Sequence, residues 1–142
     1  MNTIFKQNII LAVLMLSFAA GIIAQEAKSK DAVKLFIKIE DGIGTGSVDK
    51  FSNYFSQRNY LSFTNGAAGY YSANQSYYVI KDFLSVNRPI SFKITNMVTE
   101  TATPFAAGTL KYISNGIRTA ATVFISLQMI DNQWRISQIT IN

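Results

Sequence analysis

The sequence predicts an α+β fold in which helices pack on an antiparallel sheet. Two observations carry this prediction: the helical signals all lie before Pro89, whereas the residues after it alternate between apolar and other side chains. Apolar residues at intervals of three and four are typical of helices, and alternation of period two is typical of strands. Helices followed by a run of long strands form a layered α+β architecture.

The first 24 residues have the pattern of a secretory signal peptide. Lys6 and the free amine form a positive start, residues 9–20 are apolar, and Ala24 is a small residue before a polar segment. This order is typical of a signal that is cleaved, here after Ala24. An uncleaved membrane anchor is the alternative, but the uncharged run over 9–24 is 16 residues, and spanning a bilayer needs about 20. We expect an exported protein, periplasmic or extracellular after cleavage, with no membrane span.

Cleavage leaves 118 of the 142 residues, the size of one domain. We expect a disordered lead over 25–30 and a single domain over 31–142. The chain has no cysteine, so it offers no disulfide, no thiol–metal site and no cysteine for a lipid anchor. Stability therefore depends on apolar packing.

The charge is modest and scattered. Without Lys6 the chain has 12 basic and 8 acidic residues, a net charge of +4. Four lysines lie near the new N-terminus: Lys28, Lys30, Lys34 and Lys38. The other basic residues are isolated. Nucleic-acid-binding faces cluster basic residues among stacking aromatics, so we expect no nucleic-acid partner. The charge is compatible with weak attraction to anionic envelope surfaces and equally with ordinary solubility.

The first predicted helix begins near Ser29 and ends at Asp41–Gly42. Its core-facing residues recur at intervals of three and four: Ala32, Leu35, Phe36 and Ile39. Ser29 is a favourable N-cap, and glycine is the residue type that commonly follows a last helical turn. A flexible link over 44–46 separates this helix from the next.

A second, shorter helix is predicted after Ser47, its expected N-cap. Its apolar face consists of Val48, Phe51, Tyr54 and Phe55. Two strands then follow at about 59–64 and 68–71, separated by the Asn65–Gly66 turn pair.

The third helix, over 73–87, has the clearest start and stop. Ser72 and Gln75 have the spacing of a capping box, in which each side chain bonds the other residue's free backbone N–H. Its core-facing stripe consists of Tyr77, Ile80, Phe83 and Leu84. Pro89 blocks continuation of the helix.

Four strands complete the chain, starting at Ile90 and then spanning about 104–114, 117–130 and 133–141. Asn115–Gly116 is typical of a type I′ hairpin turn. This turn sets Tyr112 opposite Thr119, Leu110 opposite Ala121 and Gly108 opposite Val123.

Asp131–Asn132 is expected to make the next hairpin. It sets Met129 opposite Trp134 and Leu127 opposite Ile136. Beyond that point the apolar residues fall out of phase, which predicts a β-bulge near Ser137–Gln138.

The outward face of this meander has an uncharged middle, which includes Ala107, Thr109, Thr122, Phe124 and Ser126. A solvated sheet face is usually more polar. We therefore expect a homodimer in which a second copy of the chain covers this face. The alternative is a threonine-rich but exposed face.

Five short motifs together resemble the domain of unknown function 4783 family, exported proteins from Bacteroidota. They are G-x-Y-S-x-x-Q (Gly69, Tyr71, Ser72, Gln75), I-x-x-F-L (Ile80, Phe83, Leu84), P-x-S-F (Pro89, Ser91, Phe92), A-x-G-T-L (Ala106, Gly108, Thr109, Leu110) and W-x-I-x-Q-I-x-I (Trp134, Ile136, Gln138, Ile139, Ile141).

The resemblance covers about residues 32–142, with a few extra residues around Met97–Pro104. It implies the nuclear-transport-factor-2-like (or cystatin-like) cone, in which helices pack on a strongly curved antiparallel sheet around a cavity. It implies no activity, because fold alone does not supply function.

The composition argues against most catalysis. The chain has no histidine and no cysteine, which removes the usual general base, nucleophile pairs and histidine-ligated metals. A ketosteroid-isomerase-like enzyme would still need a carboxylate base in an apolar pocket. No acidic residue falls on the inward face of a predicted strand, so we predict no catalytic residue, metal site or cofactor.

The candidate ligand pocket consists of inward-facing aromatic residues, Tyr77, Tyr112 and Trp134. Such side chains suit a small apolar or amphiphilic ligand, although they equally suit a filled core. Asn96 and Gln138 are candidate hydrogen-bonding groups of the pocket or, alternatively, bulge residues. We therefore expect a non-catalytic binding module. A protein-interaction or structural domain acting through the outer sheet face is the alternative.

Overall fold

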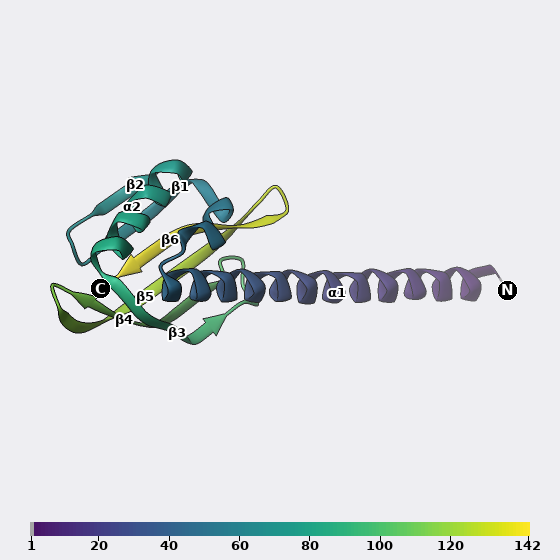
Figure 1. The fold of residues 1–142 in the computed structure, drawn as a ribbon. Helices are drawn as coiled ribbons and strands as arrows, with labels where there is room; N and C mark the ends of the chain where they lie inside the picture. Colours follow the sequence, from purple (N-terminus) through teal and green to yellow (C-terminus); the bar gives the residue numbers. More distant parts are fainter. Residues whose placement is uncertain (1) are drawn as a thin grey trace.

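The computed structural model describes residues 2–142 and contains two α-helices, two 3-10 turns and six strands (Figure 1). Their order is α1 (Asn2–Thr45), η1 (Val48–Lys50), η2 (Ser52–Tyr54), β1 (Phe55–Phe63), β2 (Ala68–Tyr71), α2 (Ala73–Val86), β3 (Arg88–Val98), β4 (Phe105–Ser114), β5 (Ile117–Ile130) and β6 (Gln133–Ile141). The α+β class predicted from the sequence is confirmed.

The six strands form one sheet in the order β2-β1-β6-β5-β4-β3. Neighbouring strands are antiparallel except β1 and β6, which run parallel. The prediction of a purely antiparallel sheet is therefore wrong at this one pair. Parallel neighbours need a long connection, and here the chain passes through β2, α2 and the other three strands before β6 returns beside β1.

Both predicted hairpins are confirmed in their register. Asn115 and Gly116 have φ angles of 50° and 79°, as a type I′ turn requires, and Tyr112 pairs with Thr119. Across the second hairpin Met129 pairs with Trp134. Turn chemistry at two short sites therefore sets the alignment of three long strands.

The predicted β-bulge is also confirmed. Ser126 pairs with Gln138, whereas the next residue, Leu127, pairs with Ile136. Ser137 is thus the extra residue of β6, and it shifts the phase of the strand. Because of this shift Ile139 and Ile141 are buried with the rest of the core.

Helix α2 begins as predicted. The Gln75 backbone N–H donates to Ser72 Oγ at 3.2 Å, and the Ser72 N–H donates to Gln75 Oε1 at 2.9 Å. The helix ends at Val86, and Pro89 lies in β3 opposite Tyr112. β3 is an edge strand, where proline is tolerated because its missing N–H breaks no central ladder.

Helix α1 differs from the prediction at both ends. It is continuous from Asn2 to Thr45, so residues 25–30 are helical rather than a disordered lead, and Ser29 is not an N-cap. The helix also passes through Asp41–Gly42 and stops before Gly46, which has a φ of +70°. Gly42 serves packing instead, since a Cβ there would lie 2.4 Å from Phe51 Cδ1.

The predicted second helix is replaced by the two 3-10 turns η1 and η2. The Ser47 side chain makes no capping bond. Strand β1 starts at Phe55, four residues earlier than predicted, and takes this residue into the sheet. The predicted helix is therefore wrong: the two turns are each three residues long, and the chain enters the sheet directly after them.

The core lies between one face of the sheet and the helices α1 and α2. Among the residues that the structure describes, all buried apolar side chains of this core lie at position 32 or later. Its largest fully buried side chains include Phe36, Ile39, Phe51, Phe83, Leu110 and Leu127. The segment before Ala32 therefore adds nothing to this core.

The N-terminal half of α1 projects away from the domain (Figure 1). Its exposed large apolar side chains include Leu14, Phe18, Ile22 and Ile23. This helix contains a stretch that is long and apolar enough to cross a membrane, a property that secretory signals share. The N-terminal helix is thus compatible with a signal sequence.

Candidate functional site

The structure does not bring the five predicted pocket residues together. Tyr112 is buried in the core, and its ring centroid lies 6.3 Å from that of Phe83. Tyr77 is half-buried, and its hydroxyl donates to Asp49 Oδ1 at 3.1 Å and accepts from Lys81 Nζ at 3.2 Å. The hydrogen bond from Lys81 to the Tyr77 hydroxyl favours the charged ammonium and so raises the pKa of Lys81. Both tyrosines therefore have structural partners.

Asn96 and Gln138 lie beside irregularities of the sheet. Asn96 is exposed on β3 after a register shift that follows Ile94. Gln138 follows the extra residue Ser137 and pairs with Ser126 on one side and Tyr60 on the other. The alternative prediction made them bulge residues, but the extra residues of the two strands are their neighbours Thr95 and Ser137.

Two predicted pocket residues line hollows, but not the same one: Gln138 lines a hollow of about 460 Å³ with Tyr60 and Tyr70, and Trp134 lines a groove. This groove has a volume of about 560 Å³ and lies between α1, η2 and the β5–β6 hairpin. We call it the basic groove; it is lined by Lys28, Asp31, Lys34, Leu35, Lys38, Asn53, Tyr54, Met129, Asn132, Gln133, Trp134 and Arg135. Its volume falls within the range of about 300–1,000 Å³ that is typical of small-ligand sites.

The helical wall of the basic groove comes from one face of α1. Lys28, Asp31, Leu35 and Lys38 are spaced by three and four residues, so their side chains share one side of the helix. Leu35 is buried against the domain, while the charged residues around it are exposed. The wall is therefore charged above an apolar base.

The opposite wall is held in place by Arg135. Its Nη1 donates to the Asn53 carbonyl at 2.6 Å, and its Nη2 donates to Gln133 Oε1 at 2.9 Å. The first bond ties β6 to η2, which carries Tyr54, and the second lies within β6. Tyr54 in turn accepts a hydrogen bond from Lys38 Nζ at 3.1 Å, so the tyrosine and lysine join the two walls.

One hydrogen bond closes the end of the basic groove. The Trp134 indole N–H donates to the Lys28 carbonyl at 2.8 Å. Beyond it lies a smaller cavity of about 320 Å³, which is also lined by Lys28 and Trp134. The half-buried Ser29 hydroxyl meets that of Thr99 at 2.7 Å on this side. The tryptophan thus anchors residues 28–29 of α1 to the domain.

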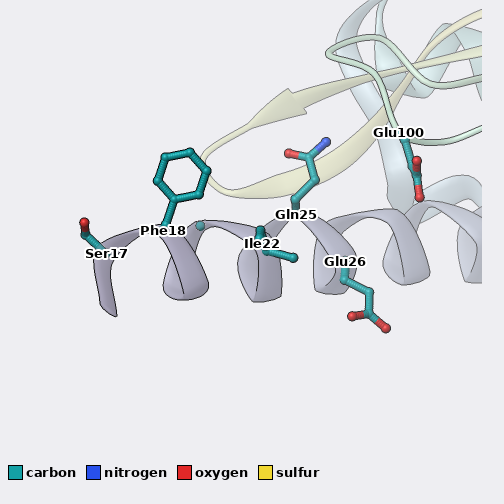
Figure 2. A pocket seen from close by; sticks show the side chains of 7 residues that line it. Ser17, Phe18, Ile22, Gln25, Glu26 and Glu100 are labelled. Atoms are coloured by element: carbon teal, nitrogen blue, oxygen red, sulfur yellow. The ribbon is translucent and has the colours of Figure 1, made fainter. Parts of the chain in front are cut away.

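A further hollow of about 650 Å³ lies where α1 leaves the domain. Figure 2 shows its lining side chains on the projecting helix, with Glu100 reaching it from the loop after β3. The complete lining is Ser17, Phe18, Gly21, Ile22, Gln25, Glu26 and Glu100. Four of these residues precede Ala24, so signal cleavage would remove most of this hollow.

The outer sheet face carries the residues predicted to form a dimer contact. Ala107 pairs with Phe124, and Thr109 pairs with Thr122. The rings of Phe105 and Phe124 are stacked with centroids 5.7 Å apart. The two threonines are exposed, while Ala107, Phe124 and Ser126 are half-buried. This surface is therefore largely uncharged in the folded chain.

The acidic residues form no catalytic constellation in the described part of the chain. Glu40 is half-buried, and its Oε2 accepts the Ile94 N–H at 2.7 Å, while the side chains of the other seven acidic residues after residue 24 are exposed. Within residues 2–142, no group of three or more acidic side chains is placed to hold a metal ion. Glu40 links α1 to β3 rather than facing a pocket.

The basic groove was missed from the sequence, although part of its signal was present. The lysines at 28, 34 and 38 stood out as a local concentration of charge. Their helical spacing indicates a shared face, but the sequence does not show that this face meets Tyr54 and Arg135. That meeting depends on contacts between residues 16 and 82 positions apart.

The chain has a nuclear-transport-factor-2-like fold. A structure of this type from Shewanella oneidensis, described as of unknown function, has a TM-score of 0.57 at 16% identity, covering 79% of this chain and 96% of that one. The model for the domain of unknown function DUF4783 matches residues 36–142, and the chain belongs to this family.

Solved members of the family show the same fold. A DUF4783 protein from Bacteroides uniformis has a TM-score of 0.67 at 16% identity, covering 74% of this chain and 93% of that one. One from Bacteroides ovatus has a TM-score of 0.64 at 23% identity, covering 73% and 90%. No curated protein matches the chain.

Proposed function

We propose that this protein is exported and acts as a non-catalytic module that binds a small apolar or amphiphilic ligand in the basic groove. The observation that carries the proposal is the groove itself. Trp134, Tyr54, Leu35 and Met129 provide apolar surface beside amide and charged groups. Small-ligand sites combine these two kinds of surface, with apolar area supplying affinity and a few polar groups supplying orientation.

Export is supported by the division of α1. Leu14, Phe18 and Ile22 before Ala24 are exposed, whereas the core of the described residues begins at Ala32. Cleavage after Ala24 would therefore remove exposed apolar surface and leave the buried core intact. Lys28 and Trp134 also lie on the retained side of this cleavage point, so the basic groove persists.

A non-catalytic role is supported by the environment of the acids. A carboxylate base needs a raised pKa or a desolvated pocket to work near neutral pH. Among the described residues, the one half-buried acid after the signal segment, Glu40, accepts a backbone N–H and lies 3.5 Å from Lys93 Nζ. These contacts give Glu40 a structural role between α1 and β3.

Native mass spectrometry of the exported protein, purified from its own envelope, tests the proposal. We expect a chain that begins at Gln25 and carries an additional small-molecule mass. A single tryptophan also makes fluorescence a report on the groove. A ligand-free mass, together with Trp134 emission that no apolar or amphiphilic compound changes, would contradict ligand binding.

A second candidate function is homodimerisation through the outer sheet face. The stacked Phe105 and Phe124 rings and the exposed threonines beside them support it. We expect light scattering to show a dimer and Phe124→Lys to make it monomeric, because a buried unpaired charge is costly. Tyr78→Lys, at an exposed site on α2, is the matched control. A wild-type monomer at working concentration would end this candidate.

A further inference from the structure

The charge of the basic groove is strongly one-sided. Its lining holds four basic residues, Lys28, Lys34, Lys38 and Arg135, and a single acid, Asp31. Lys34 Nζ lies 3.2 Å from Asp31 Oδ1, so these two charges offset each other. Three cations then remain along one groove of about 560 Å³.

None of the three remaining cations belongs to an ion pair among the described residues. Lys38 donates to the Tyr54 hydroxyl, and its ammonium lies 5.1 Å from the centre of that ring. Arg135 donates to a carbonyl and an amide oxygen. Within residues 2–142, Lys28 has no ion-pair partner. The groove therefore has an excess of about three positive charges.

The cations lie around an apolar floor rather than on a flat surface. Leu35 is buried at the base of the groove, and Trp134 and Met129 are half-buried beside it. Lysine side chains place their methylene stems along such apolar surface and keep the charge at its edge. This arrangement suits a ligand with an apolar body and a charged end.

We infer that the ligand of the basic groove is an anionic amphiphile, a single-chain molecule with a carboxylate or phosphate head. This inference rests on the proposed function and specifies its ligand class. The head lies at the end of the groove near Lys38 and Arg135, where charge-assisted hydrogen bonds stabilise an oxyanion. Lys28 lies about 15 Å along α1 from Lys38 and adds positive charge at the Trp134 end. The chain lies on Leu35, Met129 and Trp134. A cationic amphiphile is excluded by repulsion from the same residues.

Trp134 fluorescence tests this with three probes that share a twelve-carbon chain: laurate, dodecyl maltoside and dodecyltrimethylammonium. All are used below their micelle-forming concentrations on the exported protein. We expect laurate to bind about tenfold more tightly than the maltoside, and the ammonium compound to bind least, since exposed ion pairs each add a modest increment. The preference for laurate should fall as salt is added.

Two variants assign the preference to the groove. In K28Q/K38Q, laurate should bind no more tightly than the maltoside does to the same variant, so the ratio of the two affinities should fall to about one. K111Q/R118Q is the matched control, because it also removes two charges, from exposed basic residues of β4 and β5 outside the groove lining. Circular dichroism checks that both variants fold. Equal losses of laurate affinity in the two variants would overturn the inference, since net charge alone would then explain it.

Four other outcomes show whether the ligand class or the binding module itself is wrong. If laurate and the maltoside bind equally, the anionic ligand class is wrong but the binding module stands. If none of the probes and no other amphiphile changes Trp134 emission, both proposals fail. Inorganic phosphate binding as tightly as laurate would show an anion site without an apolar part. Binding to phosphatidylglycerol vesicles without binding of dispersed laurate would replace the ligand by a membrane surface. Each of the last two results also overturns the inference.

Discussion

The two halves of helix α1 have similar apolar residue types but opposite surroundings. Phe18 in the N-terminal half is 77% exposed, whereas Phe36 in the C-terminal half is 0% exposed. In the first half, residues 9–24 form an uncharged and mostly apolar run, while the second half has apolar residues at intervals of three and four with lysines between them. Periodicity rather than hydrophobicity therefore decides which half packs on a sheet.

This difference also locates the functional part of α1. The charged face at Lys28, Lys34 and Lys38 belongs to the packed half and forms one wall of the basic groove. The exposed half contributes to the hollow in Figure 2, which would not outlast signal cleavage. Four predictions test the contrast between the halves, ordered from the largest expected effect to the smallest.

The largest effect is expected for the two phenylalanines. Phe36→Ala should lower the free energy of unfolding by about 3–5 kcal/mol, because it leaves a cavity in the core. Phe18→Ala in the unprocessed chain should leave it unchanged. Urea denaturation followed by tryptophan fluorescence measures both. A similar loss in the two variants would show that the projecting half packs on the domain in solution.

The two glycines of α1 make the second pair. A Cβ at Gly42 would lie 2.4 Å from Phe51 Cδ1 and 2.9 Å from the Ser47 carbonyl oxygen, while Gly21 has no atom within 4 Å. Gly42→Ala should cost about 1–3 kcal/mol through overpacking. Gly21→Ala should increase helicity instead, since alanine favours a helix by about 1 kcal/mol. Thermal melts and circular dichroism distinguish the two; a neutral Gly42→Ala would contradict this account of its packing role.

The two glutamates of α1 differ in a smaller way. Glu40 accepts the Ile94 N–H, whereas Glu26 makes an exposed pair with Lys30 at 2.7 Å. Glu40→Ala should cost about 1–3 kcal/mol, because it leaves a backbone N–H unpaired. Glu26→Ala should cost about 0.5 kcal/mol or less. Chemical denaturation provides the values, and Glu40→Gln should recover part of the loss by restoring an acceptor.

The smallest effect concerns the boundary between the halves. Trp134→Phe removes the indole bond to the Lys28 carbonyl and should cost about 1 kcal/mol. Amide exchange should become faster over residues 28–33 and stay unchanged in α2. Hydrogen-exchange mass spectrometry measures this on the exported protein. Unchanged exchange over 28–33 would mean that the helix is held there by other contacts.

Local chemistry determined those parts of the fold that the sequence predicted well. The capping box of Ser72 and Gln75 and the hairpin turns at 115–116 and 131–132 act within a few residues of the chain. The change in alternation after Ile136 is also local, because it is caused by one extra residue, Ser137. A pattern of this kind is complete in one segment, so no distant contact is needed to interpret it.

Gly42 shows where local interpretation failed. Glycine after a lysine-bearing helical segment is typical of a helix end, yet here it lies inside α1 and makes room for Phe51. The same residue type serves both purposes, and only the position of the neighbouring ring distinguishes them. The predicted break at Ser29 failed for a related reason, since the segment before it continues the helix and Trp134 and Thr99 bind residues 28–29.

The sequence by itself determined the α+β class, the third predicted helix, the strand registers, the bulge and the family. The tertiary structure alone decided the parallel pairing of β1 with β6, the continuity of α1 and the basic groove. Turns, caps and alternation depend on neighbours in the chain, whereas a groove depends on which distant surfaces meet. Its lysines, Tyr54 and Arg135 are brought together by burial of apolar residues elsewhere in the core.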